Sequence, residues 1–171
     1  MPDAWDTWYI NQYDGKAPYE DMFFEELIPY MEKTYRIRNN KESRAIAGLS
    51  MGGYGSFLYS LHHPDMFCAC APLSAAVFDD TVMEARKNKS HRDLFNRLFG
   101  PGDEHWQQNN VLKILSDWNQ NDLPKIRYYI DCGDDDGLLD GNMQVHQIMR
   151  QKGIKHEFRV RDGGHSWTYW R

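Results

Sequence analysis

Residues 45–55 read Ala-Ile-Ala-Gly-Leu-Ser-Met-Gly-Gly-Tyr-Gly, and this stretch decides the fold. It opens with a short apolar run, as a buried strand does, and then contains the pattern Gly-x-Ser-x-Gly centred on Ser50. In that pattern the serine occupies a strained turn between a strand and a helix, which lifts its hydroxyl above the sheet. We therefore predict that Ser50 is a nucleophile held at a strand-to-helix turn.

The residues next to Ser50 fit the same interpretation. A turn this tight leaves no room for β-carbons two positions before and after the serine, so we expect glycine to be required at Gly48 and Gly52. The helix that follows presents free N–H groups at its positive end, and these can stabilise an oxyanion. The N–H of Met51 is the first donor that we expect. The alternative is a glycine-rich packing turn without chemistry.

Strand and helix patterns alternate on either side of this turn. The predicted strands span residues 45–47, 68–73, 126–132 and 156–160. The predicted helices span residues 20–35, 56–62 and 141–152. Such alternation is typical of the α/β class, in which a mostly parallel sheet is flanked by crossover helices. At 171 residues we expect one domain over residues 1–171.

Two segments depart from the simple alternation. Pro29 lies inside the first helical pattern and predicts a kink or an edge position there. Residues 79–120 are polar and mostly helical, with Gly-Pro-Gly at residues 100–102, and we expect a helical insertion or lid rather than part of the core.

A base and an acid for Ser50 are expected further along the chain, in the order acid and then histidine. Of the seven histidines, His165 alone lies in a glycine-flanked loop after the last predicted strand. The acid should follow the strand at 126–132, because catalytic groups gather at the carboxyl edge of a parallel sheet. Spacing leaves four aspartates open there: Asp134, Asp135, Asp136 and Asp140.

Two readings without catalysis compete for this acidic turn. One is a solvated turn in which Asp140 caps the next helix. The other is calcium binding, but a calcium-loop register that starts at Asp136 would place Leu138 and Gln147 at ligand positions. The cysteines and histidines also lack metal-ligand spacing, so we expect no metal.

Charge and hydropathy argue against two classes of partner. The net charge is −5 and the isoelectric point is near 5.8, which gives no electrostatic basis for binding nucleic acid. The longest apolar stretch, residues 67–78, is too short and too interrupted to span a bilayer. We therefore expect neither nucleic acid nor membrane as a partner.

Three motifs together resemble the esterase D-like branch of the α/β hydrolases. They are residues 48–55, the Cys-Gly-Asp-Asp-Asp turn at 132–136 and the Gly-Gly-His sequence at 163–165. Residues 8–11, 19–21 and 71–74 are similar to that branch as well. Within it, the chain is most similar to the acetylxylan and feruloyl esterases of carbohydrate esterase family one.

The resemblance implies an α/β-hydrolase fold and a set of roles. The family's acid is the last residue of a Gly-x-x-Asp turn, which falls here on Asp136. It implies an acyl-enzyme mechanism with Ser50 and His165 and without a cofactor. We also expect Ser74 and Trp167 to contact substrate. The resemblance also implies a secreted or periplasmic location, as is common in the family.

One departure from the family affects both ends of the chain. Family members carry an upstream half with several strands and an oxyanion loop that begins His-Gly, and this sequence has neither. Met1-Pro2-Asp3 resembles the tail of a strand from that half, and residues 167–171 stop where the family continues into a helix. We therefore expect a partial α/β-hydrolase domain, truncated at both ends, whose exposed sheet edge favours a homo-oligomer.

Three functions remain open from the sequence. The leading hypothesis is a serine carboxylic-ester hydrolase that removes acetyl or feruloyl groups from plant-wall xylan, with an acylated carbohydrate or another small ester as its substrate. The second is a thioesterase similar to S-formylglutathione hydrolase. The third is an inactive or carbohydrate-binding remnant that lacks the oxyanion loop.

Overall fold

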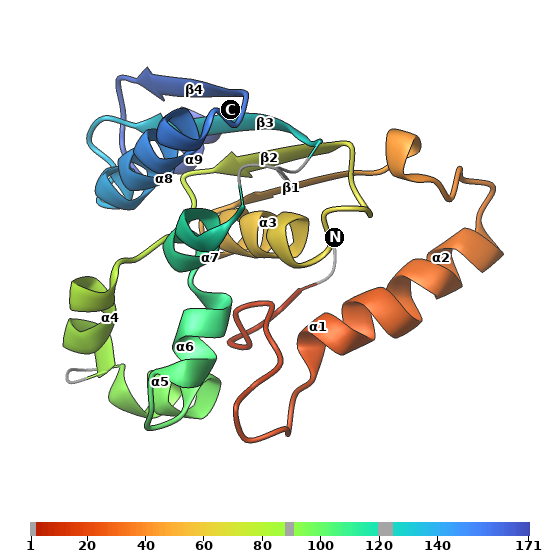
Figure 1. Cartoon of the computed structure of the whole chain (residues 1–171), viewed down its shortest axis with the longest axis horizontal. Helices are drawn as coiled ribbons and strands as arrows, with labels where there is room; N and C mark the ends of the chain where they lie inside the picture. Colours follow the sequence, from red (N-terminus) through yellow and green to blue (C-terminus); the bar gives the residue numbers. More distant parts are fainter. Residues whose placement is uncertain (1–2, 88–90, 120–124) are drawn as a thin grey trace.

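A four-stranded parallel sheet forms the centre of the computed structural model, which describes residues 3–87, 91–119 and 125–171. The strands lie side by side in chain order, and every neighbouring pair is parallel (Figure 1). They are β1 (Ala45–Leu49), β2 (Ala69–Leu73), β3 (Arg127–Gly133) and β4 (His156–Arg161). The predicted α/β class is confirmed, and each predicted strand is present to within about two residues at its ends.

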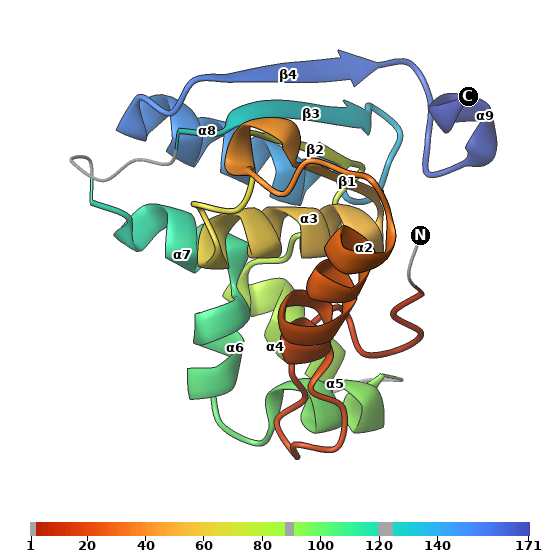
Figure 2. The same ribbon diagram turned by 90° about the vertical axis from the view of Figure 1, so that its right-hand side faces the viewer.

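Helices connect the strands and cover one face of the sheet. Helices α3, α7 and α8 lie on the same side of the strands (Figures 1 and 2). The helical segments are α1 (Tyr19–Asp21), η1 (Met22–Leu27), α2 (Ile28–Thr34), η2 (Lys41–Ser43), α3 (Met51–His62), α4 (Asp80–Lys87), α5 (Arg92–Phe99), α6 (Glu104–Asn109), α7 (Val111–Asp117), α8 (Leu139–Lys152) and α9 (Trp167–Trp170).

The core lies between the sheet and these helices. Side chains alternate across a strand, and in β3 the residues Tyr128 and Ile130 are buried while Arg127 and Tyr129 are exposed on the other face. Leu58 of α3 packs in the same core and is fully buried. Burial of one such aliphatic side chain stabilises the fold by about 1.5–3 kcal/mol.

The first predicted helix forms, but with an irregular middle. Residues 22–27 adopt π-helical geometry between α1 and α2. Pro29 lies in the first turn of α2, where it lacks an N–H to donate and its ring crowds the carbonyl four residues earlier. The wider π turn just before it relieves that conflict.

Helix α3 is longer than the sequence pattern indicated. We expected helix from residue 56, yet α3 begins at Met51 and includes Gly52, Gly53 and Gly55. Glycine weakens an isolated helix, but here close packing favours it: a β-carbon on Gly53 would lie 2.9 Å from the Cα of Ala75. Tertiary contacts therefore override the local propensity.

The segment at 79–120 is helical, as expected, but it is also part of the core. Its described residues form α4 to α7, and α4 to α6 lie below α3 in both views (Figures 1 and 2). Met83, Phe95 and Trp106 are buried in the central cluster. Our expectation of a segment outside the core was wrong in this respect, because its few apolar residues gather on the inner faces of short amphipathic helices.

Some expected features fall outside the described residues. These are Met1 and Pro2 of the proposed strand tail, and residues 120–124, which contain the end of the insertion and the proline before β3. Among the helices that are described, none combines the length and apolar character needed to cross a membrane.

Candidate active site

Ser50 occupies the turn between β1 and α3. Its backbone has φ 58° and ψ −119°, a left-handed conformation that is uncommon for a residue other than glycine. Three hydrogen bonds hold it there: its N–H donates to the carbonyl of Leu73 (2.9 Å), and its own carbonyl accepts from the N–H groups of Tyr54 (3.1 Å) and Ala76 (2.9 Å). Strain of this kind persists only where the surroundings fix it, and it is common at functional sites.

The two motif glycines have different roles. A β-carbon on Gly48 would lie 2.2 Å from the carbonyl oxygen of Gly52, so Gly48 is sterically required. A β-carbon on Gly52 would meet nothing closer than the hydroxyl of Tyr9, at 3.5 Å, which is an ordinary contact. Our expectation of a steric requirement at both positions was therefore right for Gly48 and wrong for Gly52, because the crowding falls on the backbone of residue 52.

The structure brings Ser50, His165 and Asp136 into one hydrogen-bonded chain. The Nε2 atom of His165 lies 2.8 Å from the Ser50 hydroxyl oxygen, and its Nδ1 atom lies 2.8 Å from a carboxylate oxygen of Asp136. The carboxylate accepts from Nδ1–H, which leaves the lone pair of Nε2 directed at the hydroxyl. This arrangement can remove the serine proton and stabilise the imidazolium that results.

These three residues come from three separate turns at the same edge of the sheet. Ser50 follows β1, Asp136 follows β3 and His165 follows β4. The strands all point to the side where α9 lies (Figure 2). Their meeting there is the geometry expected at the carboxyl edge of a parallel sheet.

Asp136 is a buried carboxylate, with 4% of its surface exposed. Burial alone would raise its pKa, but hydrogen bonds from the backbone N–H of Leu138 and from His165, together with the nearby hydroxyl of Ser74, outweigh burial and hold the pKa below its usual value. Asp136 is thus ionised at neutral pH. Of the four aspartates that spacing left open, it is the one whose carboxylate contacts His165.

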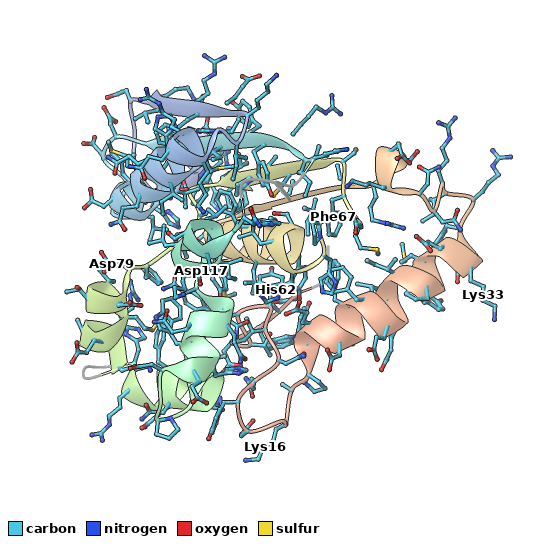
Figure 3. The ribbon with its side chains drawn as sticks, in the orientation of Figure 1. Lys16, Lys33, His62, Phe67, Asp79 and Asp117 are labelled. Carbon is cyan, nitrogen blue, oxygen red and sulfur yellow. The ribbon has the colours of Figure 1, made fainter. Side chains whose placement is uncertain are left out.

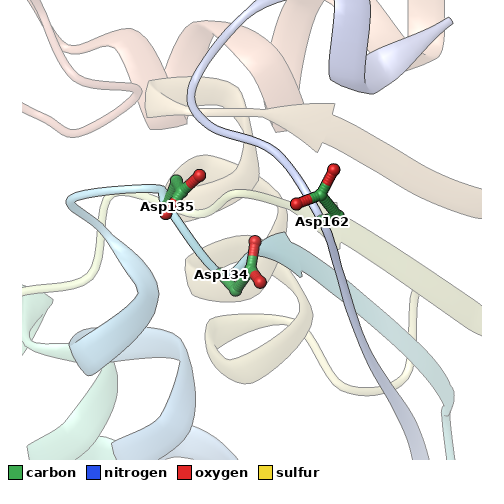
Figure 4. A group of neighbouring side chains, drawn as sticks. All are labelled: Asp134, Asp135 and Asp162. Carbon is green, nitrogen blue, oxygen red and sulfur yellow. The ribbon is translucent and has the colours of Figure 1, made fainter.

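The other acidic side chains of this region lie outside that chain of contacts. Asp134 and Asp135 follow β3, and Asp162 follows β4 (Figure 4). Their carboxylates lie within 4.8 Å of one another, and all three residues are exposed. Asp134 accepts a hydrogen bond from the N–H of Gly163 (3.0 Å), so it helps to fix the loop that carries His165.

Met51 is the first residue of α3, directly after Ser50. The first N–H groups of a helix have no intrahelical acceptor, and the helix dipole makes that end positive. The position of Met51 is compatible with donation from its N–H to an oxygen held next to Ser50, and its role as an oxyanion donor stays a prediction.

The two expected substrate contacts lie in different environments. Ser74 is fully buried, so it lies behind the His165–Asp136 pair and not on a surface that substrate could reach. Trp167 is 64% exposed, and it borders an apolar cavity of about 550 Å³ with Tyr9, Gly52 and Tyr59. Contact of Trp167 with substrate therefore stays a prediction, whereas the burial of Ser74 leaves it no surface that substrate could reach.

Sequence reasoning missed two aromatic residues at the site. Tyr9 packs on the nucleophile's helix, since a β-carbon on Gly55 would lie 2.7 Å from its ring. Trp170 lies edge-on to the His165 ring, with centroids 4.7 Å apart. Gly55, three residues beyond the motif, was a signal for the contact with Tyr9. No sequence pattern indicated the contact between Trp170 and His165.

Comparison of the sequence with known proteins identifies esterases. A family model described as "Putative esterase" matches residues 1–171. An acetyl esterase of Caldicellulosiruptor saccharolyticus is 25% identical over 99% of this chain and 66% of its own length.

Among the solved structures similar to this chain are two hydrolases. A ferulic acid esterase is 39% identical with a TM-score of 0.75, covering 95% of this chain and 58% of its own. S-formylglutathione hydrolase from Staphylococcus aureus is 24% identical with a TM-score of 0.78, over 99% and 65%. The fold is thus that of the α/β hydrolases, and the chain spans about two thirds or less of these relatives.

Proposed function

Because the chain belongs to this esterase family, we propose that it is a serine carboxylic-ester hydrolase in which Ser50, His165 and Asp136 do the chemistry. The observation that carries the proposal is the pair of 2.8 Å contacts that His165 makes with Ser50 and with Asp136. A serine, a histidine and a buried carboxylate in this order are sufficient to form and to hydrolyse an acyl-enzyme.

In the first half of the reaction, His165 Nε2 takes the proton of the Ser50 hydroxyl while Oγ attacks the ester carbonyl. The carbonyl oxygen becomes an oxyanion, and the N–H of Met51 stabilises it. The imidazolium, held by the carboxylate of Asp136, then gives its proton to the departing alcohol. The acyl group is left on Ser50.

The second half repeats these steps with water as the nucleophile. His165 takes a proton from the water, hydroxide attacks the acyl carbon, and the proton returns to Ser50 Oγ as the acid leaves. His165 therefore acts first as base and then as acid in each half, and the enzyme ends unchanged.

For the substrate, we propose acetyl or feruloyl esters of a plant-wall polysaccharide such as xylan. The proposal is supported by the similarity to an acetyl esterase and to a ferulic acid esterase. The exposed indole of Trp167 beside an apolar cavity suits a sugar ring or an aromatic acyl group.

The activity is tested with p-nitrophenyl acetate and with a fluorophosphonate probe. We expect the chain to hydrolyse the ester and to be labelled by the probe, and Ser50→Ala to do neither. Equal hydrolysis by both proteins would refute the role of Ser50. Absence of labelling together with binding to xylan oligosaccharides would instead indicate a carbohydrate-binding remnant.

The substrate class needs a separate comparison. A thioesterase is the second candidate, favoured by the structural likeness to S-formylglutathione hydrolase. Values of kcat/KM for acetylated xylan, feruloylated xylan and S-formylglutathione, measured on one preparation, would distinguish the two. We expect the xylan esters to be the better substrates.

A further inference from the structure

Ser74 is placed at the end of β2 as Ser50 is placed at the end of β1. It has φ 42°, a second left-handed serine at the same edge of the sheet, and its side chain is fully buried. Its N–H donates to the carbonyl of Asp131 in β3 (2.7 Å). A non-glycine residue adopts this conformation only where its surroundings impose it, so the position of the Ser74 hydroxyl is tightly fixed.

Trp170 links this hydroxyl to His165. Its indole Nε1–H donates to the Ser74 hydroxyl oxygen (3.1 Å), and the same indole lies against the imidazole of His165 at an interplanar angle of 87°. An indole N–H can only donate, so the hydroxyl of Ser74 is the acceptor in this bond. Its own hydrogen remains free to point toward the neighbouring Asp136 carboxylate, whose pKa the Ser74 hydroxyl lowers. The thiol of Cys132 faces the same hydroxyl.

Helix α9 is anchored so that Trp170 keeps this position. The hydroxyl of Tyr169 donates to the buried carboxylate of Asp131 (2.6 Å). The guanidinium of Arg161 donates to the same carboxylate (3.1 Å) and lies over the Tyr169 ring, 4.7 Å from its centre. One residue later in the helix, the indole of Trp170 is therefore held between Ser74 and His165.

We propose that Ser74 and Trp170 are positioning residues, which fix the Asp136 carboxylate and the His165 imidazole in the orientation that the reaction of Ser50 requires. This inference rests on the proposed function. The hydroxyl lies beside the Asp136 end of the pair, the indole packs against the His165 end, and the bond between hydroxyl and indole joins the two. Neither group has to touch substrate. The physical reason is that a hydrogen-bonded chain works only within narrow limits of distance and angle, which a supporting layer of contacts must set.

The test uses Ser74→Ala, Ser74→Gly, Trp170→Phe and the double variant Ser74→Ala/Trp170→Phe. Glycine accepts a positive φ without strain, so Ser74→Gly separates loss of the hydroxyl from backbone strain. Two matched controls remove similar groups elsewhere. Ser60→Ala deletes another fully buried hydroxyl, and Trp106→Phe deletes an indole hydrogen bond to Asp80 (2.7 Å).

We expect each single variant at the site to lower kcat for p-nitrophenyl acetate, and the rate of fluorophosphonate labelling, by about three- to tenfold, the loss expected for one hydrogen bond. KM should stay unchanged, because substrate binding is not altered. The kcat of the double variant should be little lower than that of the more impaired single variant, since both substitutions break the hydrogen bond between Ser74 and Trp170. The controls should lose stability but keep kcat.

A second readout is independent of activity. In the resting protein, the NMR signal of the proton on His165 Nδ1 reports its hydrogen bond to Asp136. We expect this proton to exchange faster with water in all the Ser74 and Trp170 variants and to be unchanged in the two controls. Wild-type values of kcat and of exchange in these variants, or losses no larger than those of the controls, would overturn the proposal. If the exchange rates change as expected but no ester is hydrolysed by the wild type, the positioning role stands and the proposed function fails.

Discussion

At the scale of single residues, the decisive feature is the crowding around the Ser50 turn. The backbone of Gly48 faces the carbonyl of Gly52 so closely that a methyl group cannot fit, whereas Gly52 itself has space. The same motif therefore contains one position that sterics fix and one that they leave open.

This difference predicts opposite effects for two similar substitutions. We expect Gly48→Ala to lower the free energy of unfolding by about 1–3 kcal/mol and to shift the Ser50 turn, because the β-carbon would overlap backbone. Gly52→Ala should be neutral or stabilising by up to about 1 kcal/mol, since alanine favours the helix. Urea unfolding of both variants checks this, and equal stabilities would contradict it.

Asp136 provides a second test at this scale. Asp136→Asn keeps the shape of the side chain but removes the charge that selects the Nδ1–H tautomer of His165. We expect kcat for p-nitrophenyl acetate to fall on the order of 10³–10⁴-fold. The exposed Asp135 offers the control, because Asp135→Asn removes a neighbouring charge without touching His165; a similar loss in the control would argue against the assignment of Asp136.

At the scale of elements, a cluster of charges joins α1 to the end of α3. His62 lies where α3 ends, beside the segment that leads into α1 (Figure 3). The carboxylate of Glu20 lies 2.8 Å from His62 Nδ1 and 2.9 Å from His63 Nε2, and His62 Nε2 lies 3.0 Å from the carbonyl of Gln108. Both ring nitrogens of His62 face acceptors, which suits the imidazolium.

The electrostatics of this cluster follow from those contacts. Burial by itself would lower the pKa of His62, but the hydrogen bond and the charge of Glu20 raise it above its ordinary 6.5. Burial would likewise raise the pKa of Glu20, but both histidines lower it, from 4.5 to about 2. The pair is therefore ionised in the folded state over a wider pH range than in the unfolded chain.

Protein stability should depend on pH accordingly. The contribution of Glu20 is complete above pH 4.5 and is lost as pH falls toward 2. The contribution of His62 is complete below pH 6.5 and is lost as pH rises through its raised pKa. We expect the cluster to stabilise the fold most between these two values, measured as the free energy of unfolding in urea.

The matched variants for this test are two glutamine substitutions. Glu20→Gln should reduce the pH dependence, whereas Glu25→Gln, at an exposed position one turn further on, should leave it unchanged. The same pH profile in both variants as in the wild type would show that the cluster is not the source.

At the scale of the whole molecule, the sheet has an open edge. Strand β1 pairs with β2 on one side, and within the described residues no strand pairs with its other side. Ala45 and Ala47 of β1 are exposed, and the strand carries no charged residue. Unprotected edges of this kind promote pairing between chains.

We therefore expect association that rises with protein concentration, and we expect Ala47→Lys to reduce it by placing a charge on the edge. Analytical ultracentrifugation over a range of concentrations measures the effect. Thr81→Lys adds the same charge at an exposed position of α4 and should leave association unchanged. Equal association of the two variants would show that the edge is not the contact.

Features that depend on neighbouring residues could be predicted from the amino-acid sequence. The alternation of strands and helices, the turn at Ser50 and the order of serine, acid and histidine are all local patterns, because side-chain periodicity and backbone sterics act over a few residues. The glycine-flanked loop was enough to single out His165 among seven histidines.

Which side chains meet where distant segments come together depends on how the elements pack in three dimensions. Spacing could not choose among four aspartates of the same turn; the choice depends on how the loop after β3 lies against the loop after β4. The same applies to Ser74, which is buried behind the His165–Asp136 pair. It also applies to Trp170, whose indole donates a hydrogen bond to Ser74, 96 residues earlier in the chain. Such contacts are set by packing between elements, and no periodicity within one element encodes them.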